Sequence, residues 1–95
     1  MREPIWHSDI DALAFVPEGH VGRCMVHRLA FRALLGSVDP SAEHCVEFYR
    51  RHVGGFATAA AAKIRAREIA PDANFHLNSR DVRRALSRQR VSESS

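Results

Sequence analysis

The stretch "DALAFVPEGHVGRCMVH" (Asp11–His27) decides the fold class of this chain. Its first six residues place Leu13 and Phe15 on one face, as in a half-buried strand. Proline and glycine in Pro17–His20 favour a turn, and Val21–His27 alternates again as a second strand. The stretch therefore predicts a β-hairpin. Because an isolated hairpin is only marginally stable in water, its apolar face needs a covering layer.

A short amphipathic helix is predicted directly after the hairpin, over residues 28–36. Gly36 suits its C-terminal cap, since glycine adopts the left-handed conformation without strain. Further along, Asp39 is predicted to cap a second helix, with Pro40 at the first helical position, where its missing N–H costs nothing. The apolar side of the short helix is expected to comprise Leu29, Phe31, Leu34 and Leu35.

The second helix is predicted to be long and to end near Ile69, before Pro71. Apolar residues recur along it at steps of three and four, which is typical of one buried stripe. Gly54–Gly55 interrupts this pattern, and each glycine disfavours a helix interior by up to about 1 kcal/mol relative to alanine. We expect one helix bent at the glycines, with a complete break there as the alternative. The stripe consists of Val46, Tyr49, Val53, Phe56, Ala60 and Ile64.

A third strand and a last helix complete the domain. Residues 74–78 suit a strand with alternate apolar side chains. Either Asn78 paired with Asp81, or Ser79 alone, is expected to cap the following helix. The predicted order is β-β-α-α-β-α, an α+β domain with a small antiparallel or mixed sheet covered by helices. The domain is expected to span residues 1–90, followed by a disordered tail over residues 91–95.

Composition narrows the function classes. The chain has 95 residues, enough for one domain, and no apolar run approaching the roughly 20 residues of a membrane helix, so a cytoplasmic location is expected. Residues 1–48 carry four basic and seven acidic groups, whereas residues 49–95 carry ten basic and four acidic groups, giving the formal net charge of +3. Such asymmetry can steer an anionic partner toward one side or guide self-association.

The chain resembles a small bacterial family, the domain of unknown function 1488. The resemblance covers residues 5–88 and implies a compact α+β domain, but it brings no activity and no catalytic residue. The double glycine at 54–55 and the alanine run that follows depart from the family's pattern. The resemblance is carried by Phe15, "CMV", "LAFRALLG", Phe48, Arg51, Phe56 with "AAAAKI", and "FHLNSRD".

An arginine-rich face is predicted on the last helix. Arg80, Arg84 and Arg88 lie at four-residue steps, and Arg83 lies on an adjoining row. Guanidinium groups match phosphate and carboxylate oxygens, so this face suits nucleic acid or an acidic protein partner. No helix-turn-helix spacing, zinc finger or aromatic strand motif accompanies it to read bases. A solvated face, favoured by cations toward a helix C-terminus, is the plainer interpretation.

Cysteine and histidine residues offer a third interpretation, a thiol-based or small-ligand site at Cys24, Cys45 and His52. Both cysteines fall on expected core faces, where thiols are unreactive. "CMVH" has metal-ligand spacing, but in a strand Cys24 and His27 point to opposite faces. We therefore expect neither an enzyme nor a metal or cofactor site. The leading hypothesis is an accessory or protein-interaction domain that recognises an unknown protein or itself.

Overall fold

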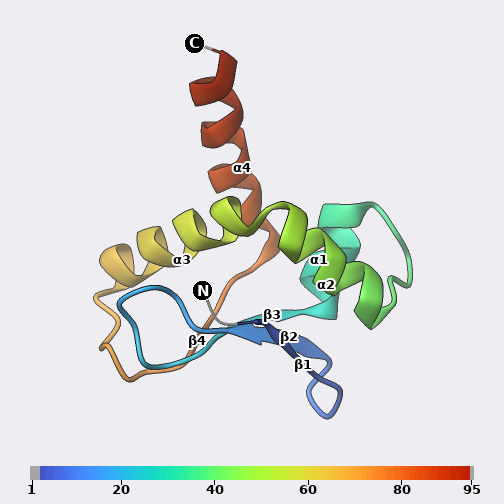
Figure 1. Cartoon of the computed structure of the whole chain (residues 1–95), viewed down its shortest axis with the longest axis horizontal. Coiled ribbons are helices and arrows are strands. Elements are labelled where there is room, and N and C mark those ends of the chain that lie inside the picture. Colours follow the sequence, from blue (N-terminus) through green and yellow to red (C-terminus); the bar gives the residue numbers. More distant parts are fainter. Residues whose placement is uncertain (1–2, 95) are drawn as a thin grey trace.

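The structure, a computed structural model, describes residues 3–94 and, for residues 89–94, the backbone alone. Its fold class is α+β, as predicted. Helices α1, α2 and α3 lie on one side of a small mixed sheet, and α4 projects from the body at its C-terminal end (Figure 1). The elements are β1 (Ile5–His7), β2 (Ala12–Phe15), β3 (Cys24–His27), α1 (Arg28–Leu35), α2 (Ala42–Arg51), α3 (Val53–Arg67), β4 (Phe75–His76) and α4 (Ser79–Ser94).

The predicted hairpin is confirmed. β2 and β3 pair antiparallel, with Leu13 opposite Val26 in the core. The turn closes where the His20 N–H donates to the Pro17 carbonyl at 3.1 Å, and Gly19 takes a φ of 77° that suits glycine. The second strand is shorter than expected and begins only at Cys24, because the N–H groups of the two residues after His20 donate to a loop outside the sheet.

The segment before β3 is held by the loop that precedes β4. The N–H groups of Val21 and Gly22 both donate to the carbonyl of Pro71, at 2.8 and 3.0 Å. A Cβ atom on Gly22 would lie 2.1 Å from the carbonyl oxygen of Ala73, which is far inside van der Waals contact. Only glycine fits at position 22, where the segment before β3 crosses the loop before β4. This crossing brings together two segments that are distant in the sequence.

The sheet contains one strand more than the sequence predicted. β1 pairs antiparallel with β2 along one edge, and its central residue Trp6 packs against the core. β4 pairs parallel with β3 at the other edge, so the strand order is β1-β2-β3-β4. β4 covers only Phe75–His76 of the predicted residues 74–78. The N–H of Leu77 nevertheless continues the ladder by donating to the Met25 carbonyl at 2.9 Å.

Helix α1 ends as predicted, with Gly36 in the left-handed conformation and its N–H bonded to the Arg32 carbonyl. The expectation that Leu29 faces the core is wrong, because 69% of its surface is exposed. Phe31 fixes the buried side of the helix, and Leu29 lies two residues away, about 200° around the helix axis. Its outward direction follows from that rotation.

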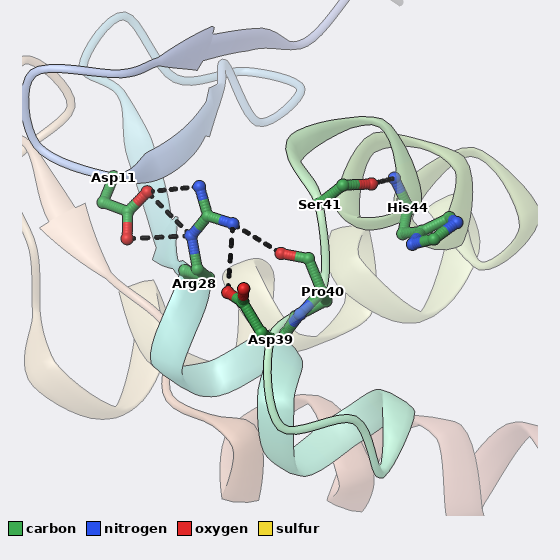
Figure 2. Close-up of polar contacts among 6 residues, drawn as sticks. All are labelled: Asp11, Arg28, Asp39, Pro40, Ser41 and His44. Atoms are coloured by element: carbon green, nitrogen blue, oxygen red, sulfur yellow. Dashed lines mark hydrogen bonds and ion pairs between the residues drawn. The ribbon is translucent and has the colours of Figure 1, made fainter.

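The predicted cap of the second helix is also corrected. α2 begins at Ala42, and its N-cap is Ser41, whose hydroxyl accepts from the His44 N–H at 3.1 Å (Figure 2). Asp39 instead lies 3.9 Å from the Arg28 guanidinium, which also donates to the Pro40 carbonyl at 2.5 Å. Because Arg28 ties these two residues back toward β2, the helix starts two residues later than predicted.

The predicted long helix is two helices that meet at His52. The His52 N–H donates to the Phe48 and Tyr49 carbonyls, and its φ of −121° ends α2. Gly54–Gly55 lies just beyond this junction, in the first turn of α3, so the helix runs through the glycines and the break precedes them. The junction lets aromatic side chains from both helices converge, since the Tyr49 and Phe56 rings lie 5.1 Å apart.

The start of α4 follows the first of the two predicted caps. The Asp81 N–H donates to the Asn78 side-chain oxygen at 2.8 Å, and the Asn78 N–H donates to the Asp81 carboxylate at 3.0 Å. This reciprocal pair satisfies two N–H groups that the helix leaves without partners. The helix continues to Ser94, into the residues 91–95 for which a disordered tail was predicted, and residue 95 lies outside the described residues. Within residues 3–94, no helix is long and apolar enough to cross a membrane.

Candidate functional site

A groove of about 320 Å³ lies between helices α3 and α4. Helix α4 supplies Arg84 and Arg88 to this groove, and α3 supplies Lys63 and Arg67 on the facing side. In each pair the two residues are four apart, about 6 Å along the helix, so their side chains stand on one face. Four cations from two helices therefore converge on one concave surface.

One carboxylate also lines the groove, and it is already engaged. The Lys63 ammonium donates to the Asp81 carboxylate at 2.9 Å, and both side chains are less than a quarter exposed. Burial alone would raise the pKa of Asp81, but the hydrogen bond from the Asn78 N–H and the ion pair with Lys63 outweigh it and lower that pKa. Asp81 thus stays ionised and fixes Lys63 beside the start of α4.

Alanine forms the bottom of the groove. Ala59 and Ala85 are buried, and Ala62 and Ala66 are exposed nearer the rim. Short side chains keep the space between the helices open, and they place a small apolar surface beneath the cations. Guanidinium and ammonium groups held around such a surface bind carboxylate or phosphate oxygens through charge-assisted hydrogen bonds.

The four arginines predicted from the sequence divide into three groups. Arg84 and Arg88 line the groove. Arg83 points elsewhere: it donates to the Ala33 carbonyl at 2.7 Å and so ties α4 to the last turn of α1. Arg80 is exposed and lies outside the lining of the groove. The last helix therefore does not present one continuous basic face. Its Arg84 and Arg88 form one side of a groove whose other side is α3.

Sequence reasoning missed the other half of this site. Lys63 and Arg67 belong to α3, and only the packing of α3 against α4 brings them opposite Arg84 and Arg88. A signal was present in the sequence, because Lys63 and Arg67 repeat the four-residue spacing of cations on a helix whose other side is apolar. The pairing of the two helices could not be read from that spacing.

The thiols proposed as a third site lie in the core. Cys24 and Cys45 are free and fully buried, and burial raises the pKa of both, that of Cys45 to about 11. A thiol is nucleophilic only as the thiolate, so neither group has the setting of a reactive cysteine. His52 lies at the junction of α2 and α3 with its ring 4.5 Å from that of Phe48.

Two histidines lie side by side on the neighbouring strands β3 and β4. The rings of His27 and His76 stack at 4.9 Å with an interplanar angle of 17°. Burial, and then the charge of His27, lower the pKa of His76. Cys24 points into the core while His27 is partly exposed, which separates the two ends of "CMVH". Among residues 3–94, no group of three or more His, Cys, Asp or Glu side chains is placed to hold a metal ion.

No known protein family, curated protein or solved structure matches the chain.

Proposed function

We propose that this chain is a protein-interaction domain without catalytic activity, and that it binds an acidic segment of a partner protein in the groove between α3 and α4. The observation that carries the proposal is the convergence of Lys63, Arg67, Arg84 and Arg88 on one concave surface. The single carboxylate among the lining residues, Asp81, is paired with Lys63 and held by the helix cap. Most of the positive charge is thus free to meet an anion.

The lining favours a protein segment over nucleic acid. Proteins that bind single strands stack bases on aromatic side chains. The residues that line this groove include no Phe, Tyr, Trp or His, and four of them are alanine. An acidic peptide can place its carboxylates on the guanidinium groups and its methylene groups on the alanines. Two free cysteines agree with the cytoplasmic location that forms part of this proposal.

Non-specific nucleic-acid binding is the second candidate. One observation favours it: α4 projects from the body at its C-terminal end (Figure 1) and carries arginines at steps of four residues. A helix displayed in this way can follow a phosphate backbone. This mode has a quantitative signature, because neutralising Z phosphates of a single strand gives a slope of about −0.7Z in a plot of log K against log salt.

The proposal is tested by titrating the full chain with a fluorescent polyglutamate peptide and, separately, with a fluorescent random-sequence single strand. The groove variant is Arg67→Ala/Arg88→Ala. Its matched control is Arg32→Ala/Arg80→Ala, which removes two exposed arginines outside the groove. Both variants lower the formal net charge from +3 to +1.

We expect the groove variant to weaken peptide binding about tenfold, since each lost charge contact contributes on the order of 0.5–1 kcal/mol, and the control to change it less than twofold. Equal losses in both variants would reduce the binding to net charge and overturn the proposal. Tighter binding of the single strand than of the peptide, with a slope near −3, would replace it with the second candidate.

A further inference from the structure

A second groove lies on the opposite side of α3 from the basic one. It measures about 590 Å³ and is enclosed by α3, the turn at residues 17–20 and the loop around residues 69–71. Its lining is mainly apolar, and Ile64 and Ile69 are both half-buried there. Its charged lining residues are Glu18 and Arg65, and the His20 ring also lines it, with its Nε2 hydrogen-bonded to the Ala73 carbonyl.

The two grooves flank the exposed side of one helix. Each residue turns an α-helix by 100°, so Ala61 and Ile64 stand on one flank of α3 and Ala62 and Lys63 on the other. The surface between the flanks carries Gly54 and Thr58 over the first turns of α3, both exposed, and Arg65 two turns after Thr58. A ligand can therefore cross from one groove to the other over the first turns of α3, and it meets the Arg65 side chain further along the helix.

The position of the two grooves on the two flanks of one helix suits a helical occupant. A helix with its side chains is about 10–12 Å across, so it can lie along α3 and send side chains into both grooves at once. The charges then fix its orientation: one flank meets Lys63, Arg67, Arg84 and Arg88, and the other meets Ile64 and Ile69.

From these two grooves we infer that the partner segment is an amphipathic helix, with acidic side chains along one flank and large apolar side chains along the other, seated along α3. The inference rests on the proposed function, and it adds the conformation of the partner and the second half of the site. Arg65, at the edge of the apolar groove, is placed to pair with an acidic residue near one end of that helix.

The test uses two fluorescent 18-residue peptides of identical composition. In the first, glutamates and leucines follow separate flanks of a helix, and in the second the same residues are shuffled so that no helical face is amphipathic. The site variant is Ala61→Lys, which places a long side chain in the apolar groove at an exposed helical position. The matched control is Ala33→Lys, an exposed alanine of α1 outside both grooves. Circular dichroism confirms that both variants keep the helix content of the wild type.

We expect the wild-type chain to bind the amphipathic peptide at least tenfold more tightly than the shuffled one, as burial of one or two leucines would give. Ala61→Lys should weaken binding of the amphipathic peptide about tenfold, and it should leave binding of the shuffled peptide unchanged or make it tighter. Ala33→Lys should leave the affinity for either peptide unchanged. Equal binding of both peptides, or equal effects of the two lysines, would overturn the helix inference.

The groove variant Arg67→Ala/Arg88→Ala keeps the two proposals separate. If it weakens both peptides while Ala61→Lys has no effect, the acidic-segment function stands and the helical partner fails. If it weakens neither peptide, both proposals fail.

Discussion

Replacement of Asp81 by alanine should destabilise the fold and strengthen anion binding at the same time. The Asp81 carboxylate accepts from the Asn78 N–H at 3.0 Å and from the Lys63 ammonium at 2.9 Å. Loss of the hydrogen bond from the Asn78 N–H, one half of the reciprocal cap, costs about 1 kcal/mol, and loss of a partly buried ion pair adds about 1 kcal/mol. The free energy of unfolding should therefore fall by about 2 kcal/mol, which corresponds to a decrease in Tm of about 10 °C in a domain of this size.

The effect of pH on this difference has a definite sign. The folded structure lowers the pKa of Asp81, so the charged carboxylate stabilises the folded state at every pH above the unfolded value of about 3.9. This stabilisation is lost as the pH falls through the lower, folded-state pKa. Urea denaturation should thus show a constant difference between wild type and Asp81→Ala from pH 5 to 8, and a shrinking difference below about pH 4.

An exposed aspartate provides the control. Asp72→Ala removes the same group from a loop and should change the free energy of unfolding by less than about 0.5 kcal/mol. Because Asp81 is the carboxylate that lines the basic groove, Asp81→Ala should also raise the affinity for polyglutamate by several-fold. A variant as stable as the wild type, or one whose difference persists unchanged at pH 2.5, would refute the role assigned to Asp81.

Three further outcomes follow from the fold. Gly22→Ala should destabilise the domain by about 2–3 kcal/mol in urea denaturation, because its Cβ would lie 2.1 Å from the Ala73 carbonyl oxygen; a neutral effect would contradict the crossing at that residue. Cys24 and Cys45 are fully buried, so a thiol reagent at pH 8 should label neither in the native chain and both in urea; fast native labelling of either would contradict their burial. Phe56→Ala should lower the free energy of unfolding by about 3–5 kcal/mol, since the fully buried ring contacts the rings of Phe31 and Tyr49; a loss below about 1 kcal/mol would show that the aromatic core is not where we place it.

The features of the fold that could be predicted from the sequence are the local ones. The alternation of Asp11–His27 predicted the hairpin, and Gly36 and the Asn78–Asp81 pair marked two helix ends correctly. Each of these features depends on residues within a few positions of one another. β1 was missed because a three-residue edge strand has too few positions to show a period.

Tertiary contacts explain the remaining differences. Asp39 has the chemistry of a cap, but Arg28 lies near its carboxylate and the hydroxyl of Ser41 caps α2 instead. Likewise, the stripe through residues 46–64 is apolar throughout, yet the chain breaks at His52 so that the rings of both helices reach one core. Neither the choice of cap nor the break at His52 can be predicted from the local sequence pattern.

Only one half of the candidate site was predicted from the sequence, for the same reason. The spacing of Arg84 and Arg88 is a local property of one helix, whereas their convergence with Lys63 and Arg67 depends on how α4 packs on α3. The packing also separated Arg83, which the pattern grouped with the site and which the fold uses to bind α1.

The most direct test of this account is a map of backbone amide shifts by nuclear magnetic resonance during titration with polyglutamate. We predict that the largest shifts fall in residues 58–67 and 81–88, on the two sides of the basic groove, and that they disappear in Arg67→Ala/Arg88→Ala. Shifts concentrated on the sheet or on α1, and unchanged in that variant, would contradict the assignment of the groove between α3 and α4 as the binding site.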